Sequence, residues 1–268
     1  MKKIILLSAV LAAATATAQV NSPTAAGCLE SGRQMLEAGN CQGCLDRVNT
    51  ADASTMSPSQ LEEAAWLRTA ATYRGGFPGA TASLEAFVKD YPASNHRVEA
   101  LIYLGNSVLE SNPARALEIY GDLNPGGVLE ADVCYHRAYA LMRLGEFERA
   151  ESAFAKTAND EAYGADSRFY MGYIAYTRRD FDKAIPLLQR ASRRSLPGAA
   201  ADYYLAQIYY MQGENGKALN AARSLIASRV VNNKSFTAEA YRIAGEALHA
   251  EGDTREAIPY LEKYVSLT

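Results

Sequence analysis

The sequence contains little of what enzymes use for acid–base, nucleophilic or metal chemistry. Only three histidines occur in 268 residues, and they are His96, His136 and His249. A catalytic histidine needs a nucleophile or a carboxylate within reach. The motifs GxSxG, HExxH, GxxxxGK[ST] and GxGxxG are all missing. We therefore predict a protein that is not an enzyme and that has no cofactor and no metal site.

An excess of positive charge is also missing. The chain has 27 Lys and Arg against 30 Asp and Glu, which gives a formal net charge of −3. Surfaces that bind nucleic acid need clustered Lys and Arg, because the phosphate backbone supplies most of the affinity. Nucleic acid is therefore not an expected partner. The one long apolar run, at the N-terminus, is about half the length of a membrane-spanning helix, so no transmembrane segment is expected.

The first 18 residues have the pattern of a secretory leader. Lys2 and Lys3 form a basic start, residues 4–14 are apolar, and Ala16-Thr17-Ala18 supplies the small residues of a cleavage site. We expect residues 1–18 to be a cleaved signal peptide and residues 19–24 to be a linker. The short leader resembles bacterial ones, which predicts a periplasmic protein.

A second interpretation of the N-terminal region is lipidation. The segment Ala25-Ala26-Gly27-Cys28 has a faint likeness to a lipobox. The apolar core ends about ten residues earlier, and an aliphatic residue normally precedes the small pair. Anchoring as a lipoprotein at Cys28 is therefore the minor alternative.

Cysteine is scarce, and three of the four cysteines lie close together near the N-terminus. An exported protein can form disulfides, so a bridge from Cys28 to Cys41 or Cys44 is an expected staple. The Cys41-Gln42-Gly43-Cys44 spacing is that of a redox motif, but no strand precedes it. Packed thiols or a staple are favoured over redox chemistry.

What the chain does contain is helical periodicity. The clearest stretch, residues 130–157, predicts a helix over about 131–144, a turn at Gly145, and a second helix from near Glu146. Ala150 and Phe154 lie on one face of that second helix. Farther upstream, Ser59 with Glu62 predicts a capping box at a helix start. No convincing strand is predicted.

This hairpin recurs along the chain. Aligning the second helices places one small residue at the same point of each, at spacings of 34–39 residues: Cys44, Ala80, Ala116, Ala150, Ala184, Ala218 and Ala257. One hairpin cannot bury its own apolar face, so neighbouring hairpins stack into a continuous core.

The recurring unit resembles the tetratricopeptide repeat (TPR) family. Trp66-x2-Thr69-Ala70-x2-Tyr73 follows the family's first-helix pattern, and Leu144-Gly145-Glu146-Phe147 matches its turn. Arg179 and Ser111 depart from it, since each replaces the turn glycine. The resemblance implies an all-α fold, an α-solenoid with a right-handed superhelix of about seven helix-turn-helix repeats. The expected array, 25–268, divides into 25–58, 59–94, 95–128, 129–162, 163–197, 198–233 and 234–268.

A finer resemblance concerns the segment Phe87-Val88-Lys89-Asp90-Tyr91-Pro92-Ala93-Ser94, followed by Tyr103-Leu104-Gly105. It is similar to periplasmic TPR proteins of the TolA-binding and outer-membrane-assembly type. That resemblance implies a role in the cell envelope.

Tyrosine is abundant, with 17 residues. In TPR proteins the first helices line a concave groove, and here they carry trios spaced i, i+4, i+7 on one face. A Tyr side chain provides a large contact area and a hydroxyl for hydrogen bonding, which favours a partner-binding strip. Packing between repeats is the competing interpretation. The predicted groove residues are Tyr135, Tyr139, Phe169, Tyr173, Tyr176, Tyr203, Gln207 and Tyr210. Asp132 and Asp166, about one turn earlier, either meet a basic ligand group or cap helices.

We therefore expect a scaffold or adaptor that binds a protein or an extended peptide in this groove. The alternatives are a glycan-binding protein that uses the tyrosine-rich face, and the N-terminal fragment of a larger TPR assembly protein. Ile258, Leu261 and Val265 give the last helix an apolar face with no polar capping helix after it. That face predicts a homodimer or a larger complex.

Overall fold

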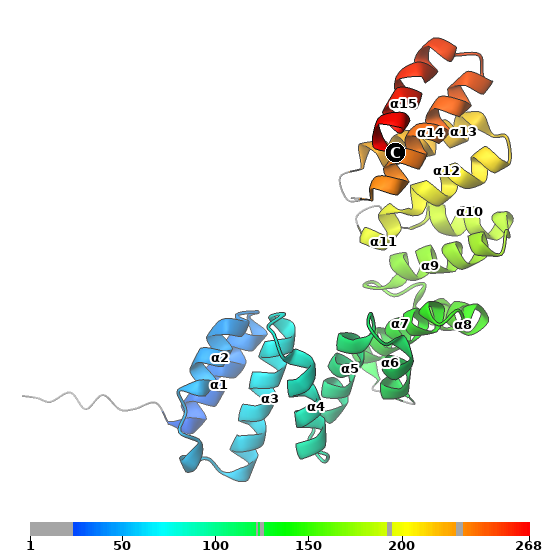
Figure 1. Ribbon diagram of the computed structural model, residues 1–268. Helices are drawn as coiled ribbons and strands as arrows, with labels where there is room; N and C mark the ends of the chain where they lie inside the picture. Colours follow the sequence, from blue (N-terminus) through cyan, green and yellow to red (C-terminus); the bar gives the residue numbers. More distant parts are fainter. Residues whose placement is uncertain (1–23, 122, 124–125, 192–194, 229–232) are drawn as a thin grey trace, which may run out of the picture. The chain divides into compact units, whose positions relative to one another are not determined.

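The computed structural model describes residues 24–121, 123, 126–191, 195–228 and 233–268, and these residues form helices without a strand (Figure 1). The expected signal peptide, residues 1–18, lies outside the described residues. The helices are α1 (Ala25–Glu37), α2 (Cys41–Asn49), α3 (Pro58–Arg74), α4 (Ala80–Asp90), α5 (Arg97–Val108), α6 (Pro113–Tyr120), α7 (Gly127–Arg143), α8 (Phe147–Thr157), α9 (Gly164–Thr177), α10 (Phe181–Gln189), α11 (Leu196–Ala199), α12 (Ala201–Met211), α13 (Asn215–Ala227), α14 (Lys234–Ala250) and α15 (Thr254–Leu267). The all-α helical-repeat fold is confirmed.

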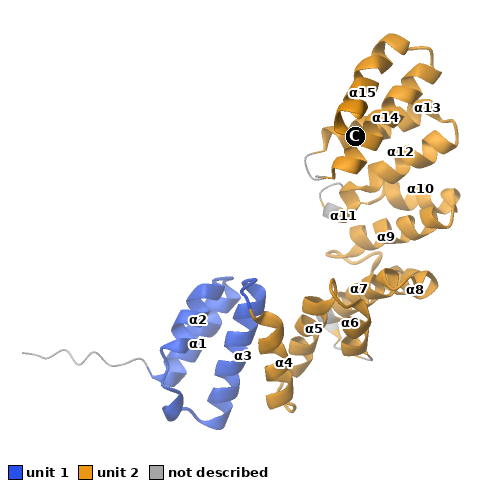
Figure 2. Cartoon of the chain, viewed as in Figure 1, with its two compact units in different colours: residues 1–78 blue, residues 79–268 orange. Residues whose placement is uncertain are grey.

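The chain divides into two compact units, residues 1–78 and residues 79–268 (Figure 2). The boundary lies between α3 and α4, inside the predicted repeat 59–94. Two short elements were not predicted: the 3-10 helix Ala53–Thr55 and α11. The handedness of the superhelix stays a prediction.

The first unit consists of α1, α2 and α3 packed together. Gly32 on α1 sits so close to α2 that an added Cβ would lie 2.7 Å from Val48 Cγ2. Trp66 and Leu67 of α3 are buried. The helix start at α3 differs from the prediction, because Ser57 and Gln60 form the capping box. Pro58 fits the first helical position, where no N–H is needed, so the cap falls on the residue before it.

In the second unit, three helix pairs, α5/α6, α9/α10 and α14/α15, follow one packing rule. A small residue on the first helix faces a large residue one turn after the aligned alanine of the second helix. Added Cβ atoms at Gly105, Gly172 and Gly245 would meet Tyr120, Leu188 and Leu261 at 2.4, 2.9 and 2.6 Å. The aligned alanines at 116, 150, 184, 218 and 257 are all buried, whereas Ala80 is half-buried. The repeat therefore holds because helix axes approach where side chains are small.

The turns explain the two departures from the family pattern. Gly145 and Gly213 take positive φ after the first helix, as Gly does readily. Arg179 occupies the same conformation with φ 60°, and it is the one described residue other than Gly with positive φ. At Ser111 no left-handed residue is needed, because α5 ends at Val108 and Asn112 caps α6 directly.

The cysteines are buried thiols rather than a staple. No disulfide joins Cys28, Cys41 and Cys44 in this structure, so the expected bridge is not formed. The Cys28 Sγ lies 3.6 Å from Thr50 Oγ1, and the Cys44 thiol donates to the Leu67 carbonyl at 3.8 Å. Each sulfur therefore faces a polar atom of a neighbouring segment. Burial raises the pKa of the Cys44 thiol to about 11, which keeps it protonated.

Candidate functional site

The predicted trios lie on α7, α9 and α12, and α14 continues their register. The aligned positions on α14 are Glu239, Arg242, Glu246 and His249, which sequence reasoning missed. The signal was available in the sequence, because Arg242, Glu246 and His249 repeat the i, i+4, i+7 spacing of the earlier helices, with Glu239 about one turn before them. The equivalent positions on α14 are charged instead of aromatic, so the abundance of tyrosine does not reveal them.

Two predicted residues belong to the core between repeats. Phe169 is buried, and Tyr135 stacks on Tyr163 with ring centroids 4.6 Å apart. Tyr135 also contacts Phe154, edge to face at 5.9 Å. Burial raises the pKa of the Tyr135 hydroxyl well above its ordinary value. For these two positions, packing describes the structure better than ligand contact.

Three tyrosines keep part of their surface on the outside of the first helices. Tyr139 carries the Arg143 guanidinium over its ring at 5.9 Å. Tyr173 meets Tyr204 edge to face at 5.3 Å, and Tyr203 stacks on Phe236 at 4.0 Å. All three are half-buried. Each ring is thus held rigidly by a neighbour while part of it faces outward.

The remaining predicted residues form a polar ladder across α9, α12 and α14. The Tyr176 hydroxyl donates to Gln207 Oε1 at 2.9 Å, and Gln207 Nε2 donates to Glu239 Oε1 at 3.4 Å. Arg242 pairs with Glu239 at 2.5 Å and with Glu246 at 2.6 Å. The ladder fixes neighbouring first helices to one another through side chains.

Tyr210 joins the ladder from α12. Its hydroxyl donates to Glu246, and the Arg242 guanidinium lies 5.1 Å from the centre of its ring. The hydrogen bond to Glu246, together with burial, raises the pKa of the Tyr210 hydroxyl. Hereafter, the first-helix face denotes Tyr139, Tyr173, Tyr203, Gln207, Tyr210, Glu239, Arg242 and Glu246.

Neither aspartate identified from the sequence caps a helix. Asp132 Oδ1 lies 2.7 Å from His136 Nδ1 and accepts a 2.7 Å hydrogen bond from the Tyr163 hydroxyl. Asp166 Oδ1 accepts a 2.5 Å hydrogen bond from Ser195. Each donor, Tyr163 or Ser195, lies just before the first helix of the repeat that follows. These carboxylates therefore connect successive repeats.

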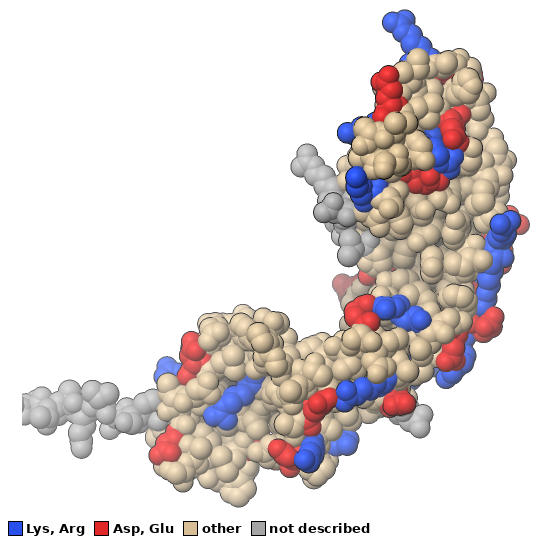
Figure 3. Space-filling model, viewed as in Figure 1, with Lys and Arg blue, Asp and Glu red and all other residues tan. Residues whose placement is uncertain are grey.

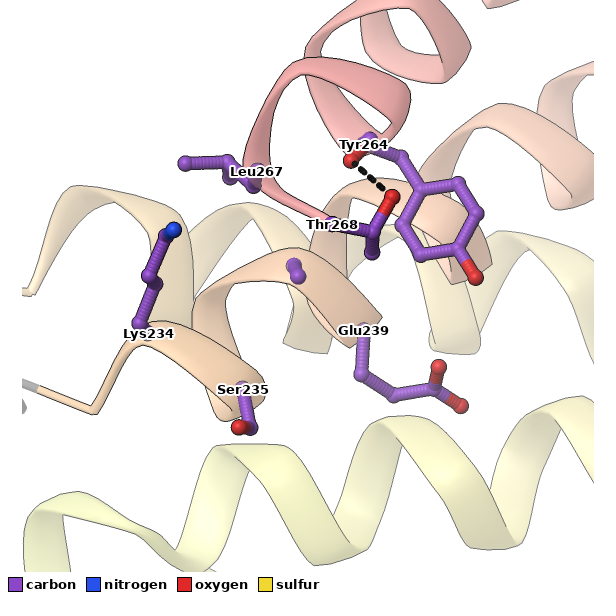
Figure 4. Close-up of a pocket in the computed structure, with 7 residues that line it drawn as sticks. Lys234, Ser235, Glu239, Tyr264, Leu267 and Thr268 are labelled. Atoms are coloured by element: carbon purple, nitrogen blue, oxygen red, sulfur yellow. Dashed lines mark hydrogen bonds between the residues drawn. The ribbon is translucent and has the colours of Figure 1, made fainter.

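A small open pocket adjoins the face at α14 and α15 (Figure 4). It has a volume of about 410 Å³, and Figure 4 shows Ser235 and Glu239 pointing to the same side of α14. The other lining residues are Lys234, Ala238, Tyr264, Leu267 and Thr268. Because Glu239 belongs to both, the pocket borders the polar ladder.

The rest of the described surface and interior shows no sign of a metal or membrane site. No group of three or more His, Cys, Asp and Glu in the described residues could hold a metal ion. Within the same residues, none of the helices has the length and apolar character needed to cross a bilayer. On the surface that Figure 3 shows, charges of both signs lie in small mixed groups.

The geometry is that of a helical-repeat protein with a protein-interaction scaffold fold, and the family comparison is consistent with this. The model of the tetratricopeptide repeat matches residues 135–191, 169–229 and 212–268, which together make up the second half of the chain. The chain therefore belongs to the tetratricopeptide repeat family. The family match does not confirm the predicted resemblance to the TolA-binding and outer-membrane-assembly type.

Solved structures share the fold at low sequence identity. A TPR protein from Parabacteroides merdae has a TM-score of 0.51 at 14% identity, covering 91% of this chain and 80% of its own. The C-terminal part of a TPR-repeat protein from Cytophaga hutchinsonii has a TM-score of 0.53 at 16% identity, covering 81% and 88%. MamA from Desulfovibrio magneticus has a TM-score of 0.51 at 17% identity, covering 63% and 94%. No curated protein matches the sequence.

Proposed function

We propose that this protein is a non-enzymatic scaffold that binds a protein partner through the first-helix face. The observation that carries the proposal is the row of Tyr139, Tyr173 and Tyr203, held rigid and half-buried beside a polar ladder. Tyr contributes a large contact area and loses little conformational entropy on binding. A ring that is already immobilised by a neighbour loses even less.

Unused hydrogen-bonding capacity supports the same proposal. Among the described residues, the hydroxyls of Tyr173 and Tyr203 have no hydrogen-bond partner, in contrast to those of Tyr176 and Tyr210. A partner's backbone carbonyl or amide can satisfy such a hydroxyl on binding. These two tyrosines are therefore the residues that we assign to the partner contact.

We also propose that the protein is exported and acts in the periplasm, in cell-envelope assembly. The leader pattern of residues 1–18 and the likeness of residues 87–94 to envelope TPR proteins support this. The position of Cys28 weighs against lipid anchoring, because Cys28 is buried within α1. Mass spectrometry of the mature N-terminus distinguishes cleavage before Gln19 from acylation at Cys28.

The test of partner binding uses the double variant Tyr173→Ala/Tyr203→Ala and a matched control, Tyr91→Ala/Tyr241→Ala. Tyr91 lies at the end of α4 and Tyr241 packs on Tyr260, away from the face. Crosslinking in envelope extract with the wild-type chain identifies partner bands. We expect the face variant to lose those bands and the control to keep them, with equal helicity by circular dichroism. Retention of the bands by the face variant would refute the proposal.

Two alternatives from the sequence have their own readouts. Retarded migration in affinity electrophoresis through polysaccharide gels would indicate a glycan ligand instead of a protein. Self-association through α15 is a secondary proposal, since Ile258 and Val265 are 49% and 69% exposed there. Sedimentation of a monodisperse monomer would exclude the homodimer.

A further inference from the structure

We infer that the partner segment is a basic extended peptide, with Lys or Arg side chains that lie over Tyr173 and Tyr203. This inference rests on the proposed function and specifies the chemistry of the partner at the same face. Two independent features support it: the cations that already lie over some of the face tyrosines, and the charge of the aligned positions around them.

The face contains four tyrosines, and the protein's own cations occupy two of them. Arg143 lies over Tyr139 at 5.9 Å, and Arg242 lies over Tyr210 at 5.1 Å. A guanidinium is attracted to the negative face of an aromatic ring, more strongly where water is partly excluded. The rings on this face are therefore suited to guanidinium contact, as the protein itself demonstrates.

Tyr173 and Tyr203 have no such occupant. In the part of the chain that the structure describes, no Lys or Arg lies over either ring, and neither hydroxyl has a hydrogen-bond partner. Tyr203 also meets Tyr204 edge to face, with ring centroids 5.1 Å apart. The first-helix face thus has two tyrosine rings, Tyr173 and Tyr203, that could accept a cation and have none over them.

Carboxylates accompany these vacant rings. Asp166 lies on the same face of α9, two turns before Tyr173, and its Oδ1 accepts a hydrogen bond from Ser195. Burial raises the pKa of the Tyr203 hydroxyl, and the nearby Glu239 carboxylate raises it further, whereas Arg242 lowers it. A partner cation over either ring would therefore gain a carboxylate neighbour as well as the ring.

The charge of the aligned positions has the same sign. In α5, α7, α9 and α14, the residue six positions before the small residue at the helix crossing is acidic: Glu99, Asp132, Asp166 and Glu239. The equivalent residue at the start of α12 is Ala200. With Glu246, Arg242 and the Arg143 that lies over Tyr139, the face and this row hold five carboxylates and two guanidiniums, a formal charge of −3. The whole chain has −3. Negative charge is thus concentrated on this face, which favours association with a basic segment.

The occupant fits an extended polypeptide better than a compact cation. Tyr173 and Tyr203 lie on successive first helices, α9 and α12. Of the rings with a cation over them, Tyr139 lies on the preceding first helix, α7, and Tyr210 lies two turns after Tyr203 on α12. One polypeptide can place basic side chains at both rings and apolar side chains between them. A single small cation can contact only one ring at a time.

The test compares three synthetic peptides of about 12 residues, ~40 Å when extended. They share Val and Ser at most positions and carry Arg, Gln or Glu at the others. Fluorescence anisotropy with the full chain should show the Arg peptide binding at least ~10-fold tighter than the Gln peptide, which corresponds to about 1.4 kcal/mol. The advantage should shrink as salt rises from about 50 to about 500 mM.

A charge-matched pair of variants localises the effect. Asp166→Asn/Glu239→Gln removes one charge from the acidic row on α9 and one from the face on α14, and Asp182→Asn/Glu262→Gln removes two exposed charges from α10 and α15. The first variant should lose the preference for Arg over Gln, and the second should keep it. Equal binding of both peptides by the wild type would overturn this inference.

The outcomes also separate this inference from the proposed function. If the Gln or Glu peptide binds best and Tyr173→Ala/Tyr203→Ala abolishes that binding, the face is a binding site and only its basic preference is wrong. If none of the three peptides binds, this inference fails, and the crosslinking experiment still decides the proposed function.

Discussion

The Tyr163 hydroxyl donates a 2.7 Å hydrogen bond to Asp132 Oδ1, and this contact connects α7 to the segment that begins α9. His136 Nδ1 lies within 2.9 Å of both the side-chain and the backbone oxygen of Asp132, so Nδ1 carries the proton. Burial opposes the Asp132 charge, but the hydrogen bonds from His136, Tyr163 and Asn106 outweigh it and lower the pKa of the carboxyl.

The lowered pKa gives a prediction for acid stability. A carboxyl with a folded-state pKa below its unfolded value, about 3.9 for Asp, stabilises the fold above that value and loses this contribution as pH falls through the folded pKa. Asp132→Asn should therefore reduce stability at neutral pH, and its difference from wild type should shrink below about pH 4. Urea unfolding from about pH 7 to about pH 3 measures this. With Asp182→Asn as the exposed control, a difference independent of pH would count against the assignment.

The crossing of α7 and α8 gives a prediction for packing. Ala150 is buried against Ala138, Leu141 and Ile174. Ala150→Leu should force these helices apart and destabilise the protein by ~1–3 kcal/mol. Ala155→Leu is the control, because Ala155 lies exposed on the same helix. If the two variants unfold at the same urea concentration, the crossing is not as close as the structure has it.

The turn after α9 gives a prediction in the opposite direction. Arg179 holds φ 60°, a conformation that costs a residue with a side chain roughly 1–2 kcal/mol. Arg179→Gly should raise the free energy of unfolding by only about 0.5–1 kcal/mol. The relief of backbone strain is partly offset, because glycine adds conformational entropy to the unfolded chain. Gly145→Ala, at φ 78°, should lower it. Thermal unfolding of both variants checks the pair, and a loss of stability in Arg179→Gly would contradict it.

Alkylation gives a prediction for the cysteines and also tests the disulfide expected from the sequence. The Cys44 thiol, with a pKa near 11, is protonated and buried at about pH 8. Iodoacetamide should leave it unlabelled in the native protein and label it after unfolding without reductant. If labelling of the unfolded chain requires a reductant, Cys44 belongs to a disulfide and the thiol assignment is wrong.

The sequence was strongest where the fold repeats. Alanines at a constant spacing, such as Ala116, Ala150 and Ala184, predict helix crossings because any larger residue there separates the axes. The pattern also identified Arg179 as an unusual turn residue. It placed a helix start at Ser59, whereas the structure has the cap at Ser57, because capping signals two residues apart compete and only the backbone resolves them.

The sequence was weaker for the candidate site. It predicted that the tyrosine trios share one face, since helical spacing fixes direction. It did not separate Tyr135, which packs between repeats, from Tyr173, which keeps an unused hydroxyl. That separation depends on which side chains the next repeat contributes, namely Tyr163 in one case and Tyr204 in the other.

By itself, then, the sequence determined the helical repeat, its period and the small residues at its crossings. These properties are local, or recur at a fixed separation, so one chain displays them without coordinates. The tertiary structure alone decided the use of each tyrosine and the ladder through Glu239, Arg242 and Glu246. Contacts between side chains about 30 residues apart depend on how each repeat is rotated against the next, and no spacing along the chain encodes that rotation.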